Sequence, residues 1–180
     1  LEQDRPAYTN KMFSLNCTGT ITLDEEEEVI DANQPASGSV DWTYLFPFYR
    51  TEWKWFNISG TTTKGQRFSL NLSSEEHYHD RENVLFLDGK ISMLGYVDFE
   101  YPNDLQVGST FTCQNKPDNP NTVAVSFVAA GKKAVELNTP VIESNYVQFV
   151  GHFSGKVKTP EVEIEFAQVT GICERQLCFW

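Results

Sequence analysis

Residues 41–55 read Asp-Trp-Thr-Tyr-Leu-Phe-Pro-Phe-Tyr-Arg-Thr-Glu-Trp-Lys-Trp. Three of the four tryptophans of the chain fall in this stretch, together with one aspartate and one arginine. Trp53 and Trp55 are two residues apart, so on a strand they share one face. Arg50 is close enough in sequence to stack on them or to pair with Asp41. Such a cluster either plugs a β-barrel or lines an apolar pocket that holds one charged pair.

Strand-like runs continue through the chain on both sides of this stretch. Runs rich in β-branched and aromatic residues cover residues 11–23, 52–60, 66–72, 83–87, 90–95, 97–101, 109–113, 122–130, 133–136, 146–156, 162–166 and 172–180. Asp88-Gly89 separates two of them and is a strong hairpin signal. No segment sustains helical periodicity over three turns, so any helix is short, around residues 35–39 or 75–81. The sequence therefore predicts an all-β fold with little helix.

The spacing of these runs favours a closed sheet over a sandwich. The strands are numerous and mostly connected as a meander, and Gly151 and Gly155 suit the bends of a closing sheet. We therefore predict one domain over residues 1–180, an antiparallel lipocalin-like β-barrel of about eight to ten strands. A barrel of this size can enclose one small apolar ligand.

Length and charge exclude several classes of partner. The 180 residues are 40% hydrophobic, enough for a domain that buries roughly 70% of its unfolded surface. The formal net charge of −11 argues against nucleic acid and against anionic membranes, because both are recognised by clustered Lys and Arg. No hydrophobic stretch approaches the ~20 residues of a membrane-spanning helix.

The acidic run Glu25–Glu28 follows Asp24 and contributes to that charge. We interpret it as a solvated hairpin tip, because like charges repel and are not buried together. The alternative is a calcium site, but the run lacks the alternating ligands and the glycine of a calcium-binding loop.

The four cysteines, Cys17, Cys113, Cys173 and Cys178, form no Cys-x-x-Cys pair. Cys173 and Cys178 are five residues apart and would project from opposite faces of one strand, which disfavours a disulfide between them. We expect free, buried thiols, which favour a reducing intracellular compartment. Sequons at Asn16, Asn57 and Asn71 are too common by chance to indicate secretion.

The order of motifs in the chain resembles a known family. The motifs are Asp41-Trp42, Tyr49-Arg50-Thr51-x-Trp53-x-Trp55, Leu70-Asn71-Leu72, Glu82-Asn83, Phe86-x-Asp88-Gly89-Lys90, Leu94-Gly95, Gln148-x-x-Gly151-x-Phe153-Ser154-Gly155, Gly171-x-x-Glu174 and Trp180. They resemble, in order and spacing, the carboxy-terminal half of the domain of unknown function 2804 family. That family consists of two-barrel, lipocalin-like proteins distantly related to AttH and carotenoid hydratase (hydroxyneurosporene synthase). Tyr44-Leu45 departs from the family, which has Arg-Gly there.

The resemblance implies a partner and a chemistry. It implies a preceding lipocalin-like domain, absent from this chain, and an apolar or amphipathic small molecule as ligand. Relatives that hydrate or cyclise isoprenoids need aromatic faces that stabilise a carbocation and a carboxyl group that donates a proton. On this reading Asp41 is the catalytic acid, and Trp42, Arg50, Trp53 and Trp55 line the pocket. The alternative is an Asp–Arg pair capped by tryptophans that closes one end of the barrel, which is the more common use of such a pair.

Other polar residues are candidates for ligand binding. Asn71, Glu82 and Asn83 could bind a ligand hydroxyl or carbonyl, or could satisfy backbone groups where a strand begins. Gln148 belongs to the family motifs, and His152 could act as an acid or base, although a structural histidine is the more common case. For Glu174 we favour a structural ion pair with Arg50 or Arg175.

No cofactor or metal is expected from the motifs. His77 and His79 stand two apart, but the segment around them is polar and is best interpreted as a solvated loop. The chain has neither a Gly-x-Ser-x-Gly elbow nor a phosphate loop. The sequence predicts a barrel that binds an apolar or amphipathic molecule and that acts on it, as a hypothesis, as a cofactor-free hydratase, isomerase or cyclase. The alternative is a structural or scaffold subunit with a filled barrel.

Overall fold

The computed structural model describes residues 7–30, 36–74, 81–115 and 118–180. Within these ranges the chain forms strands, turns and loops without a helix, which confirms the predicted all-β fold. Contacts divide the chain into two compact units, residues 1–46 and residues 47–180. In the described part of the chain no helix is long and apolar enough to cross a membrane.

The first unit contains two separate antiparallel strand pairs, of which β2–β3 is a hairpin. β1 (Ala7–Cys17) pairs with β4 (Ala36–Leu45), and β2 (Gly19–Leu23) pairs with β3 (Glu26–Ile30). The expected short helix at residues 35–39 is not found where the structure describes it, because residues 36–39 begin β4 and pair with β1. The other expected helix, at residues 75–81, falls almost wholly outside the described residues.

The acidic run lies at a hairpin tip, as predicted. Asp24 and Glu25 form the turn between β2 and β3, and both adopt a positive φ, of 49° and 72°. The following Glu26 and Glu27 begin β3 and are exposed. Their charges are therefore solvated and do not need a cation.

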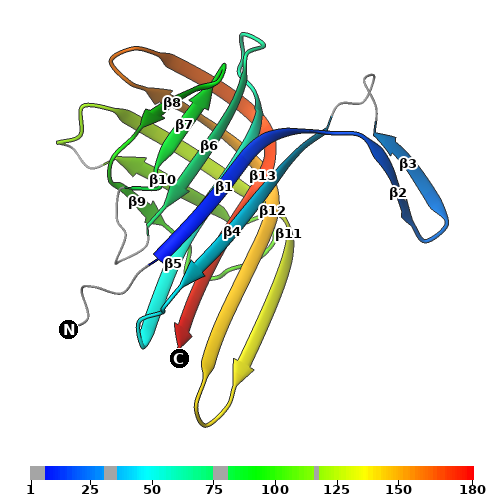
Figure 1. The fold of residues 1–180 in the computed structure, drawn as a ribbon, viewed down its shortest axis with the longest axis vertical. Helices are drawn as coiled ribbons and strands as arrows, with labels where there is room; N and C mark the ends of the chain where they lie inside the picture. Colours follow the sequence, from blue (N-terminus) through cyan, green and yellow to red (C-terminus); the bar gives the residue numbers. More distant parts are fainter. Residues whose placement is uncertain (1–6, 31–35, 75–80, 116–117) are drawn as a thin grey trace. The chain divides into compact units, whose positions relative to one another are not determined.

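The second unit is one curled, antiparallel, nine-stranded sheet, in agreement with the predicted lipocalin-like class (Figure 1). Its strand order is β8-β7-β6-β5-β13-β12-β11-β10-β9. The strands are β5 (Arg50–Thr61), β6 (Arg67–Ser73), β7 (Val84–Leu87), β8 (Lys90–Met93), β9 (Val97–Glu100), β10 (Thr110–Asn115), β11 (Thr122–Asn138), β12 (Glu143–Lys158) and β13 (Glu163–Phe179). The predicted hairpin at Asp88-Gly89 joins β7 to β8.

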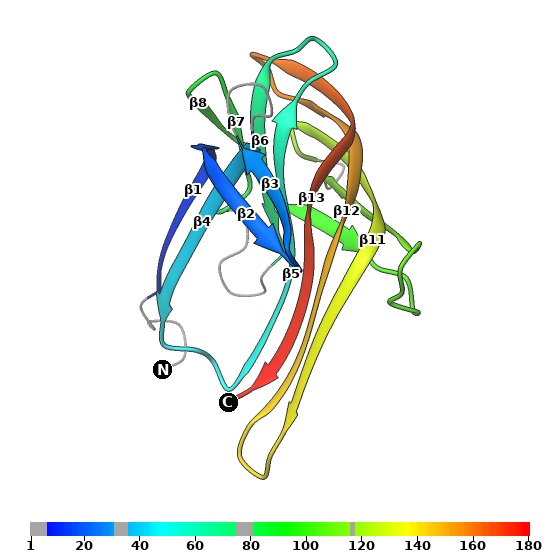
Figure 2. The ribbon, with the colours of Figure 1, turned by 90° about the vertical axis from the view of Figure 1, so that its right-hand side faces the viewer.

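Three long strands form the centre of this sheet. β11, β12 and β13 run side by side over most of their length (Figure 2). The sequence predicts two runs within β11 and two within β13, but each pair is one strand that contains a β-bulge. The register shifts between Ala129 and Gly131 in β11, and the register between β12 and β13 shifts near Gln168, which has a φ of 56°. A bulge bends a strand without ending it.

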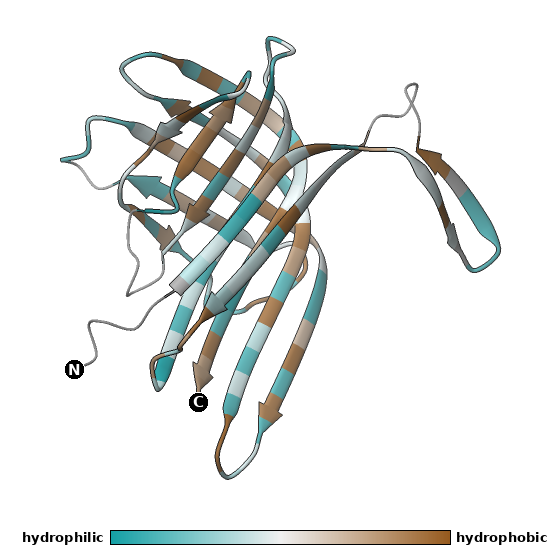
Figure 3. Cartoon of the chain, in the orientation of Figure 1, coloured by the Kyte–Doolittle hydropathy of each residue, from teal (hydrophilic) through white to brown (hydrophobic). Residues whose placement is uncertain are grey.

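One face of the sheet is a packed aromatic core. Along the central strands apolar and polar residues alternate (Figure 3). Successive side chains point to opposite faces, so one face collects the apolar side chains. This core face carries buried aromatic rings in mutual contact, which are Phe56, Phe99, Phe111, Phe127, Phe149 and Phe153, with Tyr101 beside them. Edge-to-face and tilted contacts of this kind stabilise a core beyond the area that they bury.

Asparagine side chains hold the connection between β8 and β9. The segment 93–96 links these two edge strands, and four side-chain amides donate to its carbonyl groups. The bonds run from Asn83 to Gly95 O (2.9 Å), from Asn119 to Leu94 O (2.8 Å), from Asn121 to Met93 O (3.0 Å) and from Asn115 to Leu94 O and Tyr96 O (both 3.3 Å). We call these four residues the asparagine clasp. The amides of the clasp donate to backbone carbonyl groups at the two edges of the sheet, where no neighbouring strand pairs with them.

All four cysteines are free. Cys113, Cys173 and Cys178 are buried, as expected, whereas Cys17 in the first unit is only half-buried. The side chains of Asn57 and Asn71 are also buried, so neither sequon presents its nitrogen to solvent in the folded chain.

Candidate functional site

The face of the nine-stranded sheet opposite the core carries a polar and aromatic row. Trp55 on β5 lies opposite Ser73 on β6 and opposite Glu174 on β13. Glu174 in turn lies opposite Gln148 on β12. Residues that are directly opposite in an antiparallel sheet project from the same face, so these four side chains form one row across four strands.

A second row lies beside the first. Trp53 lies opposite Gln176, and Gln176 lies opposite Tyr146. We call the surface formed by both rows and by Asn71 the Glu174 face; its residues are Trp53, Trp55, Asn71, Ser73, Tyr146, Gln148, Glu174 and Gln176. The sequence prediction that Trp53 and Trp55 share one face agrees with this register.

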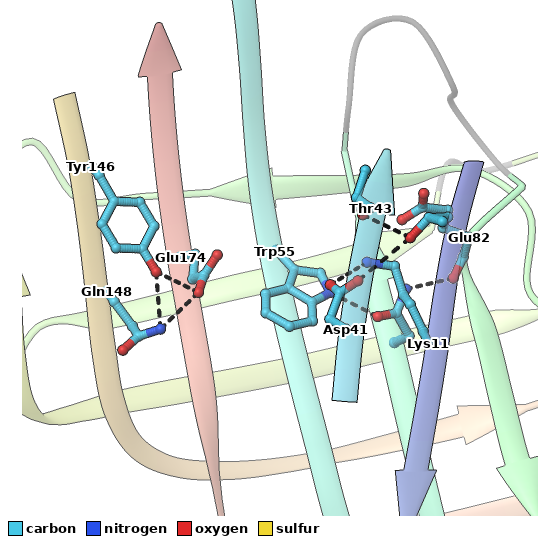
Figure 4. A network of polar contacts seen from close by, with 10 residues as sticks. Lys11, Asp41, Thr43, Trp55, Glu82, Tyr146, Gln148 and Glu174 are labelled. Carbon is cyan, nitrogen blue, oxygen red and sulfur yellow. Dashed lines mark hydrogen bonds and ion pairs between the residues drawn. The ribbon is translucent and has the colours of Figure 1, made fainter. Parts of the chain in front are cut away.

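Glu174 is the centre of a hydrogen-bond network on this face (Figure 4). Its side-chain Oε1 accepts a hydrogen bond from the Tyr146 hydroxyl at 2.6 Å and one from the Gln148 amide at 2.8 Å. Gln148 also donates to the Tyr146 oxygen at 2.9 Å. Tyr146 and Gln148 lie on one side of Glu174 and Trp55 lies on the other (Figure 4).

The surroundings of this network are partly withdrawn from solvent. Glu174 is only 9% exposed, and Tyr146 and Gln148 are half-buried. Burial, followed by the hydrogen bond to Glu174 and its charge, raises the pKa of the Tyr146 phenol well above its usual range. Tyr146 therefore stays protonated at neutral pH and donates a hydrogen bond to the carboxylate.

The expected ion pair between Glu174 and an arginine is not present. Arg175 contacts Glu52 at 3.9 Å on the other face, and Arg50 pairs with Glu52 as well. In the described part of the chain Glu174 has no ion pair, and its partners are the neutral Tyr146 and Gln148. The physical reason is the two-residue periodicity of strands, which directs Glu174 and Arg175 to opposite faces.

Trp55 is held in place by a second chain of hydrogen bonds. Its indole Nε1 donates to Asn71 Oδ1 at 2.7 Å, and the Asn71 amide donates to the Glu82 backbone carbonyl at 2.7 Å (Figure 4). Asn71 is completely buried. Asn71 and Glu82 therefore fix the orientation of the Trp55 ring.

Asn83 has the contacts of a structural residue. It is completely buried, it accepts a hydrogen bond from Ser73 N at 2.6 Å, and it donates to Gly95 O. Of the two interpretations that the sequence leaves open for Asn83, these contacts support the satisfaction of backbone groups.

Arg50 lies on the core side of β5, three and five residues before the two tryptophans that face the other way. It lines a shallow polar pocket of about 230 Å³ with Glu52, Lys54 and Ser74. The structure therefore does not bring Arg50 together with the Trp53–Trp55 pair. Its role in ligand binding stays a prediction.

Asp41 and Trp42 belong to the first unit. Asp41 Oδ2 forms an ion pair with Lys11 at 2.6 Å, and Thr9 contacts Asp41 Oδ1 at 3.5 Å. Trp42 projects from the other face of β4, is 56% exposed, and packs edge-on against Tyr8. Asp41 and Arg50 thus each have an ion-pair partner within their own unit, and the predicted Asp41–Arg50 pair stays a prediction.

The histidines contribute no described metal site. His152 is exposed on β12, opposite Val128 and Thr170. His77 and His79 lie outside the described residues. Within the described ranges no group of three His, Cys, Asp or Glu side chains is arranged to hold a metal ion.

Sequence reasoning missed the site role of Tyr146, Glu174 and Gln176. The signal that could have found them is their spacing: Tyr146 and Gln148, like Glu174 and Gln176, are polar residues two apart inside strands whose other face is apolar. That pattern predicts a polar face, but only the register brings the two pairs together.

The chain is similar in fold to solved structures with which it shares little sequence identity. A search of curated proteins finds no match. Among solved structures, the chain is similar to kievitone hydratase from Nectria haematococca, with 11% identity and a TM-score of 0.55, over 94% of this chain and 52% of that one. It also matches CghA, with 15% identity and a TM-score of 0.48, over 87% of this chain and 49% of that one. The chain thus spans about half the length of the solved structures it matches.

The structural likeness is too low in identity to show more than the fold. The sequence-family comparison is more decisive, because the model of one family matches residues 1–180. The resemblance seen in the motifs around Trp53, Trp55 and Gln148 is confirmed by this match. The chain belongs to the family described as domain of unknown function (DUF2804).

Proposed function

We propose that the protein binds an apolar or amphipathic small molecule on the Glu174 face and acts on it without a cofactor, as a hydratase, isomerase or cyclase. One observation carries the proposal: Glu174, a carboxyl group only 9% exposed, lies directly opposite Trp55 and is held in place by Tyr146 and Gln148. A buried acidic group beside an aromatic ring is a typical feature of small-molecule sites.

The filled core supports a binding site on this face rather than inside the sheet. The sequence predicts a ligand inside the barrel, but Phe56, Phe111, Phe127 and Phe153 pack against one another on the core face. A closely packed interior does not admit a ligand without a large rearrangement. The half-buried Trp53 and Trp55, with polar groups beside them, are the better platform.

The arrangement suits reactions that pass through a carbocation. Protonation of one carbon of a C=C bond leaves a positive charge on the other carbon, and the π-face of a tryptophan and a nearby carboxylate both stabilise it. Addition of water to that carbon, followed by loss of one proton from the added water, completes a hydration. Loss of a proton from a neighbouring carbon completes an isomerisation. Attack by a second C=C bond closes a ring and moves the positive charge to the other carbon of that bond, and loss of a proton beside this carbon completes a cyclisation.

Two further facts support this class of reaction. Motifs of the chain resemble a family related to carotenoid hydratase, and a protein of the same fold is named kievitone hydratase. The proton donor suggested by the sequence, Asp41, stays a proposal, because its described contacts with Lys11 and Thr9 are equally those of a structural ion pair.

The proposal is tested by mass spectrometry of an organic extract of the protein purified under native conditions. A stoichiometric apolar compound that is lost from a Trp55→Ala variant supports binding on the Glu174 face. The matched control is Trp180→Ala, at the end of β13, which should retain the compound. Recovery of no compound from either wild-type protein or control would contradict the proposal.

The filled core also favours a second candidate function. A sheet whose apolar face is occupied by its own phenylalanines is complete without a ligand, as expected of a structural or scaffold subunit. An empty extract, together with absence of binding to added amphipathic probes, would favour this second function.

We also propose that the barrel works beside a preceding lipocalin-like domain, as the family resemblance implies. The match to about half of the kievitone hydratase chain supports this proposal. Co-expression of this chain with such a domain, followed by co-purification, tests it; separate elution of the two would count against it.

A further inference from the structure

We infer that the Glu174 face takes amphipathic molecules whose polar end is a protonated amine, bound by Glu174 Oε2. This inference rests on the proposed function and names the polar group of its ligand. It follows from the geometry of one carboxylate, from its lack of a cationic partner, and from the two tryptophans beside it.

The two oxygens of Glu174 are not equivalent. Oε1 accepts both described hydrogen bonds, from the Tyr146 hydroxyl at 2.6 Å and from the Gln148 amide at 2.8 Å. Within the described residues no group donates to Oε2. The network therefore fixes the carboxylate in one orientation and leaves one oxygen for a donor supplied by the ligand.

The carboxylate also lacks a neutralising charge. An O–H···O distance of 2.6 Å is typical of a donor bonded to an ionised acceptor, but Tyr146 and Gln148 are neutral. Lys133 is opposite Gln148 and therefore two strand spacings, about 10 Å, from Glu174, and it is exposed. A carboxylate that is mostly withdrawn from water without a cation is costly, and a cationic ligand removes that cost.

The neighbouring side chains favour a cation over an anion. Trp55 lies opposite Glu174, and Trp53 lies in the adjacent row, so aromatic rings border the carboxylate. Rings of this kind attract ammonium groups and pack against alkyl chains. The net charge of −11 adds a field that repels anionic ligands.

The test uses three ten-carbon probes that differ only at the polar end: decan-1-amine, decan-1-ol and decanoate. Each is titrated into the wild-type protein at pH 7 and about 0.15 M salt, which screens long-range charge effects, with tryptophan fluorescence as readout. We expect the amine to bind at least about tenfold more tightly than the alcohol, and decanoate to bind most weakly. This order of affinities needs no variant, so it remains a test even if substitutions at Glu174 prevent folding.

Two variants that each remove one negative charge distinguish binding at Glu174 from attraction to the overall negative charge of the protein. Glu174→Gln should weaken amine binding at least about tenfold and change alcohol binding by less than about threefold. Glu165→Gln removes the same charge from an exposed position of the same strand and should change neither. Equal binding of all three probes, or an amine preference that survives Glu174→Gln, would overturn the inference and leave the proposed binding function intact. Absence of binding by every probe would overturn both.

Discussion

Trp55 and Glu174 lie directly opposite each other on β5 and β13, on the face of the sheet opposite the phenylalanine core. Hydrogen bonds fix the orientation of both side chains. Asn71 holds the Trp55 indole at 2.7 Å, and Tyr146 and Gln148 hold the Glu174 carboxylate. A site with side chains fixed in this way needs little reorganisation when a ligand binds, which favours affinity.

The asparagine clasp predicts that Asn83 contributes to the stability of the fold. Asn83→Ala removes the acceptor of Ser73 N and the donor to Gly95 O at a completely buried position. The buried Ser73 N and the half-buried Gly95 O then lose this partner, which should lower the free energy of unfolding by about 2 kcal/mol. Chemical denaturation measures the change. The exposed Asn103→Ala is the control and should cost less than about 0.5 kcal/mol; equal effects would contradict the clasp.

Two glycines of the central strands should differ in their tolerance of a side chain. A Cβ on Gly151 would lie 2.2 Å from the Val128 carbonyl oxygen and 2.7 Å from the Phe127 ring, so Gly151→Ala should cost about 1–3 kcal/mol. At Gly131 the only close neighbour of such a Cβ is a methyl group of Val150, at 2.9 Å, which can rotate away. Thermal unfolding of both variants tests the comparison. A larger loss for Gly131→Ala would contradict the packing described at the bulge.

The sequence predicts strand-forming residues in β11, but not that they form one continuous strand. Residues 122–130 and 133–136 read as two strands because a glycine usually interrupts a strand. In the structure Gly131 is part of a bulge, and β11 continues past it with a shifted register. Whether a glycine ends a strand or bends it depends on the partner strand, which local sequence does not reveal.

Buried thiols should make the protein less stable in alkali. Burial raises the pKa of Cys173 to about 12, and it raises the pKa of Cys113 well above its usual value. The unfolded thiol ionises near pH 8.5, so the stabilisation is complete below that pH and is lost as the pH rises toward 12. At pH 10 the Cys173 thiol alone should lower the free energy of unfolding by about 2 kcal/mol.

Denaturation at pH 7 and pH 10 measures this loss. The Cys173→Ala variant is the control and should show a smaller decrease between the two pH values, because its contribution to the titration is removed. A wild-type protein whose stability does not change between these pH values would contradict the assigned burial of the thiols.

The ion pair of Asp41 with Lys11 gives a separate prediction for the first unit. Asp41→Asn breaks the pair, whose side chains are 31% and 15% exposed, and should lower stability by up to about 1 kcal/mol. A double-mutant cycle with Lys11→Met should give a coupling energy of up to about 1 kcal/mol between the two residues. Loss of turnover with unchanged stability and unchanged ligand binding would instead support the catalytic role predicted for Asp41.

The candidate site was only partly predictable for a physical reason. The shared face of Trp53 and Trp55 follows from the two-residue period of a strand. Glu174 lies more than a hundred residues further along the chain, and its position opposite Trp55 depends on the order of the strands and on the bulge in β13. Sequence periodicity gives the face of each residue but not its partner across the sheet.

The central claim is that an amphipathic molecule binds on the Glu174 face. The most direct test is an NMR spectrum of the four tryptophan indole N–H groups, recorded during titration with decan-1-ol. The account predicts that the Trp55 signal moves most and the Trp53 signal next. Trp180 is six residues beyond Glu174, one residue past the end of β13 and about 20 Å away, so its signal should stay in place. A titration that moves Trp180 and leaves Trp53 and Trp55 unchanged, or that moves none of them, would contradict the account.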